Sequence, residues 1–352
     1  MQKSLKKFSK KFRINMKKRM KILITTGIYP PKIGGPAQYA LNLKESFERM
    51  GHFVYIKTFN IENSLPTGIR HIFFFIKIIP AVLRADVIFA LDTFSVGLPT
   101  SMASGLFGKK MIIRTGGDFL WEQYIERTGR KILLRNFYST ERSNLSFKEK
   151  LVFRLTKWTL HNTVHIIFST DWQRDIFINA YNLDKSKTSI VENYYGHKEE
   201  DIEPTAKEFI GSTRKLVGKN LDTLENVFKK IQKDNPEVSL FFANLPFGEL
   251  MQRMKNSYAV ILVSFGDISP NMILDAIRLN RPFICTREVG MYERIKDAGI
   301  FVDPLNENEI EAAILNLLTE NGYKKAKEKV RNFNFVHTWE QIADEFLNVL
   351  II

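Results

Sequence analysis

The chain has 352 residues, 44% hydrophobic and 26% charged; this balance excludes a disordered protein, and the length allows two domains of ordinary size. Its only cysteine, Cys285, excludes a disulfide framework within the chain and fits a reducing compartment such as the cytoplasm, and no apolar run is long enough to span a bilayer. The net charge of +14 is divided into +19 over residues 1–190 and −5 over residues 191–352, which indicates that the first part faces a polyanion or an anionic membrane.

The first 20 residues form a separate basic segment. Together with Lys21 they contribute ten Lys or Arg residues and no acid. Leu5, Phe8, Phe12 and Met16 fall on one stripe of a helix, with lysines on the other face. This pattern predicts either an amphipathic segment that lies on anionic lipid or a disordered basic tail.

Residues 21–190 are predicted to form a first domain that begins with a βαβ unit. Strands are expected at residues 21–26 and 53–58, with a helix from about Ala37 to Met50 between them. Gly34 and Gly35 precede that helix, where small residues allow the backbone to approach a diphosphate at the helix N-terminus. An ordinary tight turn is the simpler explanation of the glycine pair.

The alternation of strands and helices continues with a strand at residues 86–90, a helix at 97–107 and a strand at 111–114. Asp118 follows the last of these, and is either a polar group of a ligand cleft or the N-cap of the next helix. Residues 127–150 are polar and basic, which predicts a mobile or surface-facing insertion.

A second domain is predicted over residues 191–335, after a charged linker at residues 198–204. Arg214 and Lys219 lie in its first loop, between a strand at 209–211 and a helix that starts near Leu221. Two cations before a helix N-terminus can clamp a diphosphate, although a solvated basic loop has the same composition.

The most informative stretch of the second domain follows a buried strand at residues 259–263. Asp267 lies in the loop after this strand, Asn271 starts a helix, and Asp275 lies on that helix. Loops at the carboxyl ends of parallel strands bind ligands, and these carboxylates could accept hydrogen bonds from sugar or ribose hydroxyls. The alternative is an N-cap aspartate followed by an exposed helical aspartate.

These motifs, in this order, resemble those of the family-4 retaining glycosyltransferases of the GT-B fold (glycosyl transferases group 1), over roughly residues 21–349. The family has two glutamates where this chain has Asp267 and Asp275, and a diphosphate-binding Arg and Lys where it has Arg214 and Lys219. The chain departs from the family in both aspartates, in lacking a histidine in the loop of Gly117 and Asp118, and in having one helix where relatives add a strand and a helix after residues 238–243.

The resemblance implies an α/β protein with two Rossmann-like domains facing a cleft, and a C-terminal helix within residues 336–352 that crosses back to the first domain. It implies a metal-independent hexosyltransferase of polysaccharide biosynthesis that uses a nucleotide-diphosphate sugar as donor and needs no cofactor. Expected partners are a glycan or lipid-linked acceptor and an anionic membrane surface on the cytoplasmic side, but not nucleic acid. The resemblance assigns catalytic roles to Asp118 and Asp267, and donor binding to Gly34, Gly35, Arg214, Lys219, Asn271 and Asp275. The alternative is a non-catalytic relative that binds a nucleotide sugar or a partner enzyme.

Overall fold

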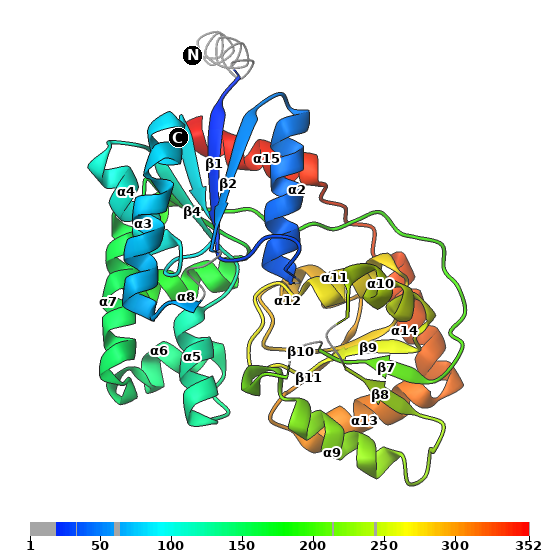
Figure 1. The fold of residues 1–352 in the computed structure, drawn as a ribbon. Helices are drawn as coiled ribbons and strands as arrows, with labels where there is room; N and C mark the ends of the chain where they lie inside the picture. Colours follow the sequence, from blue (N-terminus) through cyan, green and yellow to red (C-terminus); the bar gives the residue numbers. More distant parts are fainter. Residues whose placement is uncertain (1–18, 33, 60–63, 213–214, 243–244, 352) are drawn as a thin grey trace, which may run out of the picture. The chain divides into compact units, whose positions relative to one another are not determined.

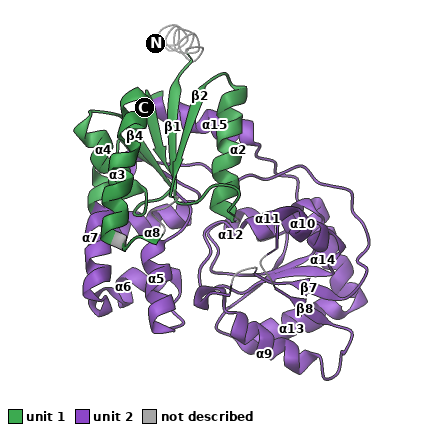
Figure 2. Ribbon diagram, viewed as in Figure 1, with its two compact units in different colours: residues 1–114, 158–166, 351 green, residues 115–157, 167–350, 352 purple. Residues whose placement is uncertain are grey.

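Two parallel β-sheets, each covered by helices, form the framework of the computed structural model (Figure 1). The structure describes residues 19–32, 34–59, 64–212, 215–242 and 245–351. The first sheet has the strand order β2-β1-β3-β4-β5-β6, and the second has the order β11-β10-β9-β7-β8. By their contacts the residues divide into two compact units, one up to Arg114 with 158–166 and 351, the other with 115–157 and 167–350 (Figure 2). The predicted α/β class with two Rossmann-like domains is confirmed.

Four of the six strands of the first sheet, β1 to β4, lie where the sequence predicted them. Its strands are β1 (Lys21–Thr26), β2 (Phe53–Thr58), β3 (Val87–Ala90), β4 (Met111–Thr115), β5 (His165–Phe168) and β6 (Thr188–Ile190). Its chain segment also contains α2 (Gly35–Arg49), α3 (Thr67–Arg84), α4 (Gly97–Leu106), α5 (Phe119–Thr128), α6 (Leu134–Thr140), α7 (Phe147–His161) and α8 (Asp171–Tyr181). Because β1 pairs in parallel with both β2 and β3, helical crossovers must connect them.

Helix α3 lies between the strands predicted at residues 53–58 and 86–90, where no element is expected from the sequence. The structure shows an 18-residue helix with Pro80 inside it. Phe74, Ile78 and Val82 are fully buried at i, i+4 spacing, so packing supports the helix beyond the proline. Within the described part of the chain, no helix is long and apolar enough to cross a membrane.

The second sheet contains five short strands. They are β7 (Glu208–Ile210), β8 (Ser239–Phe241), β9 (Ala259–Leu262), β10 (Phe283–Thr286) and β11 (Ile300–Val302). The helices of this part are α9 (Leu221–Ile231), α10 (Phe247–Asn256), α11 (Asn271–Arg278), α12 (Tyr292–Ile295), α13 (Glu307–Leu318), α14 (Glu320–Asn332) and α15 (Trp339–Asn348). As the sequence predicted, α10 is the one helix between β8 and β9 in the described residues.

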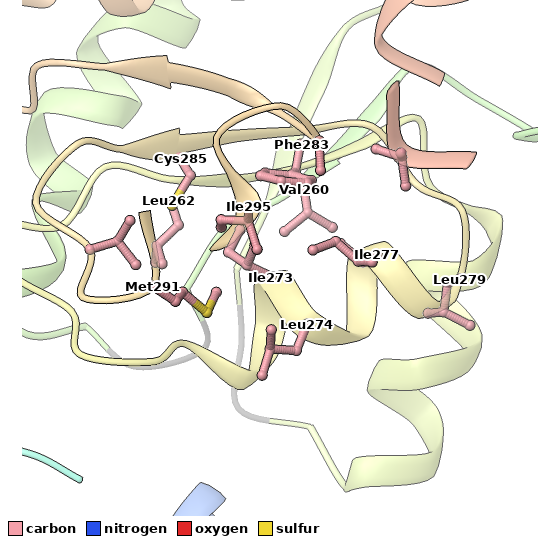
Figure 3. Packing of buried hydrophobic residues seen from close by; sticks show 14 of the residues in the cluster. Val260, Leu262, Ile273, Leu274, Ile277, Leu279, Phe283, Cys285, Met291 and Ile295 are labelled. Atoms are coloured by element: carbon pink, nitrogen blue, oxygen red, sulfur yellow. The ribbon is translucent and has the colours of Figure 1, made fainter. Parts of the chain in front are cut away.

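Two hydrophobic clusters cover the two faces of the second sheet. Val260 and Leu262 of β9 and Cys285 of β10 point into the cluster that contains Ile273 of α11 (Figure 3). Ile261, between them on β9, belongs to the opposite cluster with residues of α9 and α13. This alternation along a strand buried on both faces explains why the sequence of β9 is continuously apolar.

The predicted linker is attached to the helices of the second sheet. The ammonium group of Lys198 donates to the carbonyl oxygens of Ile277 and Val330 at 2.8 and 2.6 Å, and burial lowers the Lys198 pKa to about 8. Asp201 accepts a 2.9 Å hydrogen bond from Arg281, whose side chain is fully buried. Lys198 and Asp201 are among the charged residues on which the linker prediction was based, and here they bind this segment to the helices.

We expect that replacing Ile261 with Ala destabilises the protein by about 2–5 kcal/mol, because it opens a cavity under the central strand. Leu315→Ala on α13, where the side chain is 40% exposed, serves as the control and should change stability little. Thermal unfolding measures both. Equal melting temperatures for the two variants would contradict the assignment of Ile261 to the core.

Candidate functional site

An ion pair between Lys219 and Asp267 marks the carboxyl edge of the second sheet. Lys219 ends the single turn Val217–Lys219 before α9, and Asp267 lies in the loop after β9. Their charged groups are in direct contact, and the side chains are 19% and 15% exposed. The structure thus brings together the predicted diphosphate-binding cation and the predicted sugar-binding carboxylate. Arg214, the second predicted cation, lies outside the described residues.

Asn220 fixes the position of Lys219. Its backbone is left-handed, with φ of 55°, a conformation that asparagine tolerates better than most residues. Its buried side-chain amide donates to the carbonyl oxygens of Val263 and Pro304 at 3.3 and 2.8 Å. The start of α9 is therefore tied to the loops at the ends of two strands, so Lys219 must project at the edge of the sheet.

The Asp267 loop is held from its other side by Glu288. The amide of Asp267 donates to the carbonyl oxygen of Glu288 at 2.9 Å. The carboxylate of Glu288 in turn binds Arg135 in a two-point contact of 2.6 and 2.5 Å. Burial raises the pKa of Glu288, and Arg135 partly offsets this effect. A two-point arginine contact also fixes orientation, so Arg135 restrains the loop that carries Asp267.

Two glycines allow α5 to lie against both site loops. A Cβ on Gly218 would come within 3.3 Å of the Trp121 ring, and one on Gly266 would meet the same ring at 3.3 Å and Leu134 at 2.5 Å. The amide of Leu134 also donates to the carbonyl oxygen of Phe265 at 3.1 Å. A Cβ on Gly218 would also lie 2.9 Å from Ile125, so close approach of the backbone to side chains of α5 and α6 is the reason for glycine at both positions.

Asn271 and Asp275 lie on α11, the helix that follows the Asp267 loop. Asn271 is the first helical residue, and its side-chain oxygen accepts from Asn193 at 3.2 Å. Asp275 accepts from Arg278 at 3.2 Å and is 18% exposed. Burial raises the pKa of Asp275, and Arg278 acts in the opposite direction. Asp275 is thus a largely buried, paired carboxylate, unlike the exposed helical aspartate of the alternative interpretation.

Asp118 is the N-cap of α5, as the alternative interpretation predicted. One carboxylate oxygen accepts from the Trp121 amide at 3.0 Å, and the other accepts from the Tyr138 hydroxyl at 2.7 Å. Tyr138 contacts the Tyr181 hydroxyl at 2.9 Å. Burial raises the pKa of Asp118 from its ordinary value of 3.8 to about 6. Its proposed catalytic role stays a prediction, and in this arrangement both oxygens already have intramolecular donors.

Gly34 lies directly before α2 and Gly35 is the first residue of this helix, both in the other compact unit. Gly34 is the N-cap, with φ of 150°, and α2 begins without a side-chain cap. A Cβ on Gly34 would lie 3.1 Å from Ile28. Pro36 has no amide hydrogen and the Ala37 amide donates to the Gly34 carbonyl oxygen at 3.0 Å, which leaves the Gly35 amide to receive an anion, and donor binding by this pair stays a prediction.

Two further features of the described residues, a hollow and the arrangement of potential metal ligands, add no residue to this site. A hollow of about 310 Å³ lies between residues 195–198 and 333–336 and contains none of the predicted site residues. Among the described residues, no group of three His, Cys, Asp or Glu side chains could hold a metal ion.

Sequence reasoning missed the contributions of Gly218, Arg135 and Glu288. Residues 127–150, predicted as a mobile or surface-facing insertion, are mostly exposed and form the end of α5, α6 and the start of α7. Arg127 and Arg130 pair there with the buried carboxylates of Glu149 and Glu141. For Gly218 the sequence did contain a signal, because a solvated basic loop does not require glycine directly before Lys219.

Replacing Asp118 with Asn tests its buried charge. Because the folded protein holds the Asp118 proton more tightly than the unfolded chain, stability falls as pH rises from about 4 to 6, by about 3 kcal/mol. We expect the wild-type melting temperature to fall over this range by several degrees more than that of Asp118→Asn. Asp234→Asn, at an exposed position, should behave as wild type. Parallel pH profiles for all three proteins would contradict the pKa assignment.

The comparisons with known proteins rest on structure. No family model matches the sequence, and no curated protein matches it. HepE from Anabaena, solved with UDP and glucose, superposes with a TM-score of 0.68 at 13% identity, over 95% of this chain and 100% of that one. Sucrose-phosphate synthase from Thermosynechococcus elongatus has a TM-score of 0.66 at 12% identity, over 95% and 98%.

The fold is shared by more than one class of enzyme. A UDP-GlcNAc 2-epimerase from Methanocaldococcus jannaschii, solved with UDP-GlcNAc and UDP, has a TM-score of 0.55 at 12% identity, over 94% of this chain and 99% of that one. At these identities the likeness shows the fold alone. The chain therefore has the GT-B fold.

Proposed function

We propose that this protein is a glycosyltransferase that moves a sugar from a nucleotide-diphosphate sugar to a glycan or lipid-linked acceptor, with retention of configuration. The contact between Lys219 and Asp267 at the carboxyl edge of the second sheet is the observation that carries the proposal. It unites a cation suited to phosphate and a carboxylate suited to sugar hydroxyls, where open α/β sheets bind ligands.

The proposed chemistry is mainly electrostatic. Cleavage of the donor leaves negative charge on the diphosphate and positive charge on the sugar ring. Lys219 and the amides at the start of α9 would stabilise the diphosphate, with Arg214 as the second cation. Once Lys219 turns to the diphosphate, the Asp267 carboxylate is released to accept from sugar hydroxyls. A metal ion and a cofactor have no part in this proposal.

The remaining site residues would complete donor recognition. Asp275 keeps one oxygen outside its bond with Arg278 and would accept from the ribose hydroxyls. Asn271, at the start of α11, would lie beside it, while Gly34 and Gly35 would admit the donor diphosphate at α2. Asp118 would act on the sugar-transfer step through the part of α5 that it caps.

We place the enzyme at the cytoplasmic face of an anionic membrane, in polysaccharide biosynthesis. The charge of +19 on residues 1–190 supports this location, because the family resemblance makes residues 21–190 the acceptor-binding domain, and this domain is basic. A lipid-linked acceptor would be presented at such a surface. No module for nucleic-acid recognition accompanies the basic residues.

The alternative is a non-catalytic subunit that binds a nucleotide sugar or a partner enzyme. Asp267 and Asp275 replace glutamates of the resembled family, and the residues described between β8 and β9 form only α10 where relatives add a strand and a helix, which favours this alternative. Product analysis with a panel of nucleotide sugars separates the possibilities. Transfer to an acceptor supports the proposal, epimerised donor would contradict it, and donor binding without turnover would support the subunit.

Lys219→Ala is expected to weaken donor binding by about 1.5–3 kcal/mol, the range for hydrogen bonds to charged groups. Arg214→Ala should act in the same direction. Lys229→Ala on the exposed side of α9 is the matched control and should leave affinity unchanged. Calorimetric titration with the donor measures all three. Unchanged affinity in both Lys219→Ala and Arg214→Ala would remove the diphosphate assignment.

Asp267→Asn and Asp275→Asn should each reduce turnover while shifting the melting temperature by only a few degrees. Glu at the same positions should preserve or raise activity, because it restores the carboxylate with a longer reach. Asp297→Asn, at an exposed position, is the control. If the Asn variants retain full turnover, these carboxylates do not contact the donor.

A further inference from the structure

Helix α7 has an apolar stripe that stays exposed to solvent in the folded protein. Phe147, Leu151 and Trp158 lie on one face of the helix and are 85%, 46% and 43% exposed. A contiguous row of exposed apolar side chains on a surface helix indicates an interaction surface. The opposite face is anchored, since Phe153 and Thr156 are buried.

Four cations line a hollow beside this stripe. Arg142, Lys150, Arg154 and Lys157 surround an apolar floor of Leu145 and Phe153, in a cavity of about 350 Å³. The guanidinium of Arg142 lies 4.8 Å from the centre of the Phe153 ring. Arg154 falls in line with the stripe, between Leu151 and Trp158, and Lys150 and Lys157 flank it on one side of the helix.

Carboxylates are kept away from this side of α7. Glu149, the one acid of the helix, points inward, where it binds Arg127 at 2.7 Å and the Ser146 amide at 2.7 Å. Among the described residues, no carboxylate lines the hollow or forms an ion pair with its four cations. The positive charge of the hollow is therefore not neutralised by the described part of the chain.

We propose that α7 lies on an anionic lipid bilayer, with its apolar stripe in the headgroup region and a lipid phosphate in the cationic hollow. A helix with aromatic and leucine side chains on one face and Lys or Arg beside them binds in the plane of the interface. Each cation near an anionic surface strengthens binding. The exposed aromatic and leucine side chains favour lipid over nucleic acid, because contacts with phosphates alone leave them in water.

This assignment deepens the peripheral membrane location of the proposed function and gives it a specific surface. It does not depend on which sugar is transferred. The hollow contains none of the donor-site residues, so its occupation and donor binding can be measured separately.

Vesicle flotation of the full chain tests the proposal, with equimolar phosphatidylcholine and phosphatidylglycerol compared with phosphatidylcholine alone. Lys150→Glu with Arg154→Glu should lower partitioning into the anionic vesicles at least about tenfold. The matched control, Lys325→Glu with Lys329→Glu, makes the same charge change at i, i+4 on exposed positions of α14 and should have less than about a twofold effect.

A second pair of variants tests the apolar stripe. Phe147→Ser should lower partitioning at least about threefold, because it removes an exposed aromatic side chain from the proposed interface. Phe247→Ser at the start of α10, where the side chain is 48% exposed, is the control and should leave partitioning unchanged. Calorimetric titration with the donor should give wild-type affinity for all four proteins, which shows that the donor site is intact.

The outcomes separate the two proposals. If the wild-type protein binds anionic and neutral vesicles equally, both the membrane location and the assignment of α7 to the bilayer are overturned. This result is expected if α7 instead binds an acidic protein. If the wild-type protein prefers anionic vesicles but the α7 variants match their controls, the α7 assignment alone is overturned. Loss of vesicle binding in the α7 variants alone, with donor binding retained, supports it.

Discussion

The contact between Lys219 and Asp267 depends on the burial of the second sheet on both faces, which restricts charged side chains to the ends of its strands. Every residue of β9 faces one of two hydrophobic clusters, so a charged side chain can lie only beyond its ends. At the carboxyl end, Asn220 and Glu288 hold the two loops with hydrogen bonds to backbone groups. The ion pair is therefore not an independent surface bridge, because the backbone around it is restrained on both sides.

Local patterns were enough to predict several of the strands but not α3. The bounds of β1 and β2 agree with the prediction because each is a short apolar run enclosed by turn residues. Pro80 disfavours a continuous helix through this position, since proline lacks an amide hydrogen and clashes with the preceding turn. The burial of Phe74, Ile78 and Val82 against the rest of the fold outweighs that local cost, and such packing is not visible in a single segment.

The same distinction applies to the candidate site. Lys219 and Asp267 could be chosen from their positions after strands and before helices, which are local features. The ion pair of Arg135 with Glu288 joins residues 153 positions apart, and no local pattern predicts which of several arginines makes it. Asp118 could be given two roles from its sequence context, and only the positions of Trp121 and Tyr138 show that it caps a helix.

Cys285 makes the second sheet chemically observable. Its thiol is fully buried in β10, and burial raises its pKa well above the ordinary value, so it is protonated and shielded from solvent. An alkylating reagent can therefore modify it only when β10 opens, which makes the labelling rate a measure of local unfolding. Because the chain has no other cysteine, the label reports the opening of this one sheet, without a contribution from the first.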